Sequence, residues 1–138
     1  MKKTRFELST REQHVMDLFW STGDGLTSVD ILEQLNDIMV NPTYVHRSLS
    51  ALLEKRFIQE CGSVRYNKQY ARKFKPTLTK EEFAAGLLAE KGMQLKSLKG
   101  IAMAFLNQSD DTDDANSQKK QNVINELKQM IDELESGN

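Results

Sequence analysis

Apolar residues recur at helical spacing in the first 39 residues, and this pattern predicts two short helices. The first begins at Ser9-Thr10-Arg11-Glu12, where a hydroxyl and a carboxylate are spaced as in a capping box, and it ends at Gly23-Asp24-Gly25. A second hydroxyl-to-acid box, Thr27-Ser28-Val29-Asp30, opens a helix whose apolar face continues to Met39. Leu26 lies between the two helices and is expected to form a strand of one or two residues.

A third helix is expected from Asn41 to Arg56. Asn41 is a good N-cap residue, and Pro42 follows it at the first helical position, where proline is favoured. The positions that repeat at helical spacing and face the core are Val45, Leu49, Leu52 and Leu53.

The period of the pattern changes after this helix. Residues 57–61 read as a strand, Gly62-Ser63 as a turn, and Val64 to Ala71 as a returning strand that carries Tyr66 and Tyr70. Three short helices followed by a hairpin make a winged helix-turn-helix. The expected fold class is therefore mainly α with a small β-hairpin.

The rest of the chain returns to helical spacing. Thr79 to Glu82 is another capping box, and Gly92 interrupts the apolar stripe that follows. An acidic linker at about 107–117 is expected to be mobile, and residues 118–135 form a last amphipathic helix. Its coiled-coil positions hold Ile124, Leu127, Ile131 and Leu134.

These helices carry more apolar surface than about 60 residues can cover alone, and two-fold pairing is the commonest remedy. We therefore predict a winged helix DNA-binding domain over 1–76 and a C-terminal helical dimerisation region over 77–138, with the chain acting as a homodimer.

Charge is distributed unevenly along the chain. Residues 1–75 hold 12 Lys+Arg against 9 Asp+Glu, whereas residues 76–138 hold 7 against 11. Within 41–75 the count is 8 against 2, a net +6 on the third helix and the hairpin. A basic block of this kind suits a polyanion, although charge alone is equally consistent with a solvated face. Its position on a winged helix favours double-stranded DNA as the partner.

If the third helix lies in a major groove, its outward side chains approach bases and phosphates. The outward set is Thr43, Tyr44, His46, Arg47, Ser50 and Ala51. Arg47 is the best single candidate, because its planar fork pairs with guanine or with a phosphate. Thr43 can donate to a phosphate near the helix N-terminus, and the phenol of Tyr44 can do the same. The alternative is a solvated Arg47 and a partly buried Tyr44.

Cations also cluster in the hairpin. Arg65 and Lys68 are expected to flank its turn, where a wing tip reaches a minor groove or its phosphates. Arg72, Lys73 and Lys75 come later and are expected only to solvate the end of the strand.

The residues that catalysis or metal binding would need are sparse. His14 and His46 sit on separate predicted helices, and neither has a histidine or cysteine at ligand spacing, so we expect no metal and no cofactor. Cys61 is the single cysteine; it is expected to be a buried, inert thiol rather than a redox sensor. No phosphate loop or activated nucleophile is present, so the protein is not expected to be an enzyme. No apolar run is long enough to span a membrane, and one cysteine fits a reducing cytoplasm.

The layout resembles the penicillinase-repressor (BlaI/MecI/CopY) family of winged-helix transcriptional regulators. The resemblance rests on four segments taken in order: Leu8 to Trp20, Asn41-Pro42-Thr43-Tyr44-Val45, Tyr66-Asn67-Lys68-Gln69-Tyr70 as a second wing strand, and Lys75 to Phe83 as the entry to the dimerisation helices. It implies a dimeric transcriptional repressor that binds a palindromic operator and is controlled by an upstream signal, such as an inducer or a regulatory protease.

The chain also departs from the family pattern. The middle of the third helix reads His46-Arg47-Ser48-Leu49 instead of the usual threonine-leucine pair, and Arg56 stands where a glycine is common. The chain contains neither of the features on which induction depends in the family: it has no Asn-Phe dipeptide for cleavage, and residues 62–138 hold no cysteine cluster for a metal. Neither of the family's induction mechanisms therefore carries over. The alternative function is a protein-protein interaction module with no specific DNA target, whose acidic C-terminal half would dock a basic partner.

Overall fold

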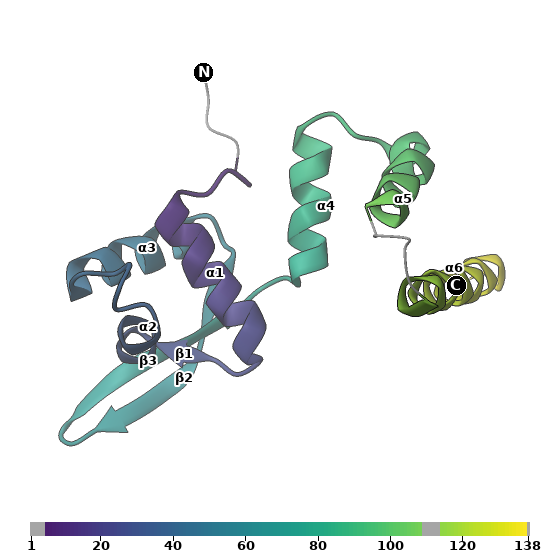
Figure 1. Ribbon diagram of the computed structural model, residues 1–138. Coiled ribbons are helices and arrows are strands. Elements are labelled where there is room, and N and C mark those ends of the chain that lie inside the picture. Colours follow the sequence, from purple (N-terminus) through teal and green to yellow (C-terminus); the bar gives the residue numbers. More distant parts are fainter. Residues whose placement is uncertain (1–4, 109–113, 138) are drawn as a thin grey trace. The chain divides into compact units, whose positions relative to one another are not determined.

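A computed structural model describes residues 5–108 and 114–137 of the chain. The described residues divide into two compact units, 1–92 and 93–138. The first unit holds α1 (Thr10–Thr22), β1 (Leu26–Thr27), α2 (Ser28–Gln34), α3 (Pro42–Glu54), β2 (Ile58–Tyr66), β3 (Gln69–Pro76) and α4 (Lys80–Glu90) (Figure 1). The second holds a 3-10 turn, η1 (Leu95–Ser97), and the helices α5 (Leu98–Asn107) and α6 (Asp114–Glu135).

Local side-chain caps set the starts of three helices of the first unit. Ser9 caps α1, Thr27 caps α2 and Thr79 caps α4, and each hydroxyl accepts the N–H of an acidic residue three positions on. That acidic side chain in turn accepts the N–H of the capping residue, so both ends of each capping box are closed. The helix starts predicted from these boxes are confirmed.

Two helix ends differ from the sequence prediction. The helix α2 stops at Gln34 although the apolar pattern continues, and Met39 still reaches the core from the turn that follows. The helix α3 ends at Glu54, and Arg56 adopts a left-handed backbone with φ 65°. The predicted end at Arg56 was therefore too late, because a left-handed residue cannot continue a right-handed helix.

The hairpin turn also lies elsewhere than predicted. The sheet has the order β1-β3-β2, all antiparallel, and its β2–β3 register runs from Ile58 opposite Pro76 to Tyr66 opposite Gln69. The turn is thus at Asn67 and Lys68, with Asn67 at φ 56°. Gly62 belongs to a β-bulge, where the register shifts between Glu60 and Gly62. A bulge accommodates an extra residue and the unusual backbone of a glycine, so Gly62-Ser63 imitates a turn in the sequence.

Aromatic side chains join α4 to the winged helix. Phe83 of α4 lies 5.4 Å from Trp20 and 5.3 Å from both Phe6 and Phe57, measured between ring centroids. Its side chain is 6% exposed, and the indole N–H of Trp20 donates to the carbonyl of Leu78 at 3.1 Å. These contacts make α4 part of the same core as α1 and α3.

The second unit has no buried side chain in the parts described, residues 93–108 and 118–137. Its large apolar residues face outward, among them Leu95 (90% exposed), Phe105 (67%) and Leu134 (70%). The predicted last helix is confirmed and begins earlier, at Asp114, so the end of the expected linker is helical. The middle of that linker, 109–113, lies outside the described residues.

Candidate nucleic-acid interface

The helix α3 is held with one face in the core. The side chain of Asn41 accepts the N–H of Thr43 at 2.9 Å, and Pro42 starts the helix. The buried face consists of Val45, Ser48, Leu49 and Leu52. Each apolar side chain of this kind contributes about 1.5–3 kcal/mol when fully buried, so the helix is fixed in rotation about its axis. The opposite face is thereby presented to solvent.

That solvent face brings four of the predicted residues together. Thr43, His46, Arg47 and Ser50 are all exposed, and they line one shallow hollow with Ala51 and Glu54. Three hydrogen-bonding side chains around an arginine provide the donors and acceptors that base edges and phosphates require.

Tyr44 lies at the side of this face rather than on it. It is half-buried, and the guanidinium of Arg11 from α1 stacks over its ring, 3.9 Å from the centroid. Tyr44 and Arg11 line a second hollow, of about 350 Å³, together with Arg47 and Ser48. Arg11 is not among the residues predicted from the sequence, because it lies more than 30 positions before Tyr44 and no local spacing links it to α3.

The wing tip carries the two predicted cations. Lys68 sits in the turn itself, and Arg65 is two residues from it, with its Nε–H donating to the carbonyl of Asn67 at 2.8 Å. Both side chains are exposed. They gather at the end of the hairpin, apart from the hollow on α3.

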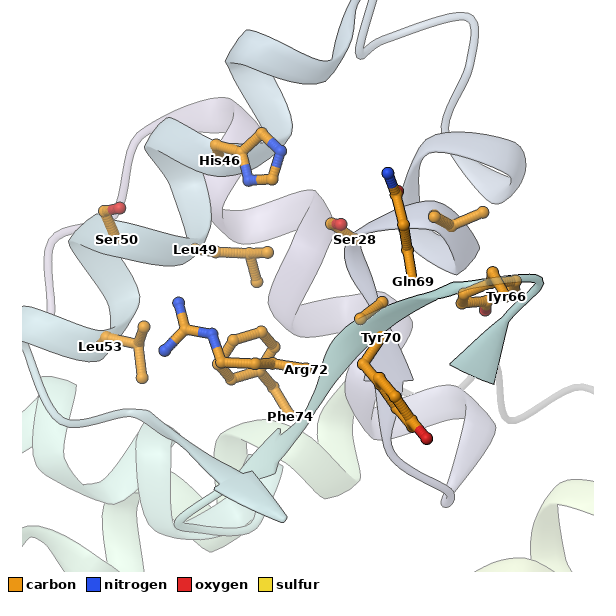
Figure 2. Close-up of a pocket in the computed structure, with 12 residues that line it drawn as sticks. Ser28, His46, Leu49, Ser50, Leu53, Tyr66, Gln69, Tyr70, Arg72 and Phe74 are labelled. Carbon is orange, nitrogen blue, oxygen red and sulfur yellow. The ribbon is translucent and has the colours of Figure 1, made fainter. Parts of the chain in front are cut away.

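A third hollow, of about 390 Å³, separates α3 from the hairpin (Figure 2). Leu49 and Leu53 of α3 face Phe74 of β3 across it, and Arg72 reaches into it from β3. The hydroxyl of Tyr66 shares a hydrogen bond with that of Thr27 at 3.1 Å, which ties the wing to the start of α2. His46 and Ser50 border both this hollow and the exposed face.

Arg72 was expected only to solvate the end of a strand; its side chain is 64% exposed, but it lies within β3 and lines the hollow beside α3. Side chains two positions apart in a strand share a face, so the buried Phe74 places Arg72 on the side that looks toward α3. The alternation from Arg72 to Phe74 can be seen in the sequence, but the predicted strand ended at Ala71, before both residues. The carboxylate of Glu60 lies 3.5 Å from the Arg72 guanidinium.

Cys61 is exposed, so the expectation of a buried thiol is also wrong. The residue sits at the bulge, where the irregular register turns its side chain outward. Among the described residues no three His, Cys, Asp or Glu side chains gather as metal ligands would. Nor is any helix of the described chain both apolar and long enough to cross a bilayer.

The chain matches the penicillinase repressor family over residues 8–133. Among solved structures it is similar to a mutant of MepR from a multidrug resistant S. aureus clinical isolate, with a TM-score of 0.52 at 18% identity over 91% of this chain and 81% of that one. A mutant of Lactococcus lactis ZitR gives 0.44 at 18% identity, covering 96% and 79%. The adhesin competence repressor of Streptococcus pyogenes gives 0.42 at 14%, covering 99% and 86%. No curated protein sequence matches the chain significantly.

The family match spans nearly the whole chain, and the structural likeness to MepR agrees with the winged-helix fold described above. The exposed polar face of α3, the basic wing tip and this match point to the same class of protein. The chain belongs to the penicillinase repressor family and is a winged-helix, DNA-binding repressor of transcription.

Proposed function

We propose that the protein acts as a homodimer on a palindromic operator, with α3 of each copy in a major groove. The observation that carries this is the exposed face of α3. Arg47 lies there among Thr43, His46 and Ser50, opposite a face that is fixed in the core. A polar, cationic helix face that is rotationally fixed is what direct reading of bases requires.

Each side chain has a distinct role in this proposal. Arg47 pairs bidentately with a guanine, and His46 and Ser50 contact neighbouring base edges. Thr43 donates to a phosphate beside the start of α3, and the Tyr44 phenol reaches the backbone at its side. At the wing tip, Arg65 and Lys68 contact the adjacent minor groove or its phosphates.

The second unit supports the homodimer. Its described helices place Ile124, Leu127, Ile131 and Leu134 at coiled-coil spacing, and these side chains are not buried within one chain. A second copy would cover them symmetrically. We propose that residues 1–76 bind DNA and that residues 77–138 dimerise, with α4 of the latter region also packed on the winged helix through Phe83. We place the protein in the cytoplasm with its DNA. Release of the operator then requires a separate signal, from an inducer or a regulatory protease.

Binding to the DNA that lies upstream of the protein's own gene tests the proposal. Fluorescence anisotropy should show saturation at two chains per duplex, with an affinity that falls steeply as salt rises. A duplex with one scrambled half-site should bind far more weakly. Equal affinity for the upstream region and for random duplex would contradict the proposal and favour a protein-interaction module.

Two substitutions of Arg47 distinguish recognition of a base from electrostatic attraction to the phosphates. Arg47→Ala should weaken operator binding by about 1–3 kcal/mol. Arg47→Lys is the matched control, because it keeps the charge but loses the planar fork. It should retain the salt dependence and lose most of the preference for operator over random duplex. Unchanged preference in both variants would show that Arg47 does not read a base.

A further inference from the structure

Two arginines stand on opposite sides of the exposed face of α3. We propose that Arg11 and Arg72 each hold one backbone phosphate, so that the recognition helix is clamped between the two strands of the groove it enters. This inference rests on the proposed operator binding and adds to it two contact residues that lie outside α3 and the wing tip.

On one side, Arg11 is already positioned for this role. Its guanidinium lies 3.9 Å from the centroid of the Tyr44 ring, and it shares the 350 Å³ hollow with Arg47. The neighbouring acid, Glu12, is engaged by Lys55 at 3.0 Å and by the N–H of Ser9. Stacking on an aromatic ring restricts the long side chain, so less freedom is lost when a phosphate binds.

On the other side, Arg72 lies in the hollow between α3 and β3, where Figure 2 shows it reaching toward Leu53 and Leu49. Its guanidinium is 5.1 Å from the Phe74 ring centroid, and its side chain is 64% exposed. An apolar floor favours a guanidinium that keeps contact with water, and His46 and Ser50 line the same hollow.

The order of these hollows around α3 matches the order of features across a major groove. Arg11 lies beside Tyr44, Arg72 lies beside Leu49 and Leu53, and the hollow of Thr43, His46, Arg47 and Ser50 lies between them. A helix in a major groove about 12 Å wide has base edges in front of it and a phosphate strand on each side. The two arginines therefore face the strands while the centre faces the bases.

Glu60 gives the Arg72 side a built-in competitor. Its carboxylate lies 3.5 Å from the guanidinium, and a phosphate must displace it or share the charge. The exposed pair is weak in water, so a phosphate can replace it. Removing the carboxylate charge should consequently strengthen DNA binding through Arg72.

Salt titrations of full-length variants test the clamp. Arg11→Met and Arg72→Met keep the length and apolar stem of each side chain while removing the charge. Each should make the slope of log affinity against log salt shallower by about 0.9, on operator and random duplex alike, and the double variant by about 1.8. The ratio between the two duplexes should stay unchanged. Lys91→Ala, which removes an exposed cation at the end of α4, is the control and should leave the slope unchanged.

A double-mutant cycle tests the competitor. Glu60→Gln should tighten binding about two- to fivefold in the native chain, and should have little effect when Arg72 is methionine. An equal gain in both backgrounds would mean that Glu60 acts on DNA directly and would overturn its role as competitor. If Arg11→Met and Arg72→Met bind DNA with the same slope of log affinity against log salt as the native protein, and keep the operator preference, the proposed phosphate contacts are wrong while the proposed function stands. Loss of operator preference in the native protein would overturn the proposed function itself.

Discussion

At the scale of single residues, Arg56 shows how one side chain strains the end of the recognition helix. Its φ of 65° lies in the left-handed region, which costs an L-residue about 1–2 kcal/mol. The position is nevertheless fixed, because the carbonyl of Arg56 accepts the hydroxyl of Thr77 at 2.7 Å and the next N–H bonds to Leu52. The strain is therefore held by contacts with neighbouring segments.

Arg56→Gly should stabilise the protein by about 0.5–1 kcal/mol, because glycine adopts this backbone freely, and this relief exceeds the unfolded-state entropy that glycine adds. Denaturant unfolding of the first unit measures the change. Arg56→Ala is the matched control, since it removes the guanidinium and keeps the strain. An equal gain of stability in Arg56→Ala would show that the effect comes from removing the charge.

Position 86 of α4 holds a glycine because the Phe6 ring occupies the space that a side chain would need. A Cβ built at this position would overlap the Phe6 ring, which packs at 5.1 Å from Phe57 and 5.3 Å from Phe83. Gly86→Ala should destabilise the first unit by about 1–3 kcal/mol despite the better helix propensity of alanine. In a Phe6→Leu background the penalty should shrink, as thermal unfolding can show; an undiminished penalty would place the clash elsewhere.

At the scale of elements, the hairpin is tied to the helices by a side-chain hydrogen bond. The hydroxyls of Tyr66 and Thr27 are 3.1 Å apart, and Thr27 is fully buried while also capping α2. The bond therefore links the angle of the wing to the start of α2.

Tyr66→Phe should cost about 0.5–1.5 kcal/mol of stability, because the buried Thr27 hydroxyl then keeps only its hydrogen bond with the N–H of Asp30. The rate of hydrogen exchange at the β2 and β3 amides should also increase in this variant. Tyr70→Phe is the control, as that side chain is 69% exposed, and its change should stay within about 0.5 kcal/mol. Equal effects at both positions would argue against the link between wing and helix.

The elements that sequence predicts well are those set by local chemistry. Hydroxyl-acid pairs at Ser9, Thr27 and Thr79 act over three residues, so the helix starts were readable. The hairpin register was not, since it depends on Phe74 pairing with Leu26 of a distant segment, and Gly62 offered a false turn. The candidate site likewise has a part that depends on local sequence and a part that depends on tertiary contacts. The exposed side of α3 was predictable from its periodicity, whereas the stacking of Arg11 on Tyr44 arises only in the folded chain.

At the scale of the whole molecule, the two units differ in how they are stabilised. The first has a core that includes Phe19, Ile31 and Leu52, each at most 1% exposed. The second exposes apolar side chains on every described helix. In the proposed homodimer, a second copy would cover these side chains and so stabilise the unit.

Ile131→Glu should abolish self-association, because it places a charge in the middle of the apolar stripe of α6. Sedimentation equilibrium measures the change, and the winged helix should keep its own unfolding transition. Gln129→Glu introduces the same charge on the polar side of α6 and should leave association nearly intact. Equal disruption by both would show that net charge, rather than the stripe, controls assembly.

The lack of a buried side chain in residues 93–108 and 118–137 also bears on dosage in the cell. If the proposed homodimer covers this unit, the unit is stable only at chain concentrations high enough for two copies to associate. While most chains are monomeric, the concentration of dimers would grow as the square of the chain concentration, so halving that concentration would cut the concentration of dimers about fourfold. Dilution by cell growth would then act on the regulated genes before any inducing signal arrives.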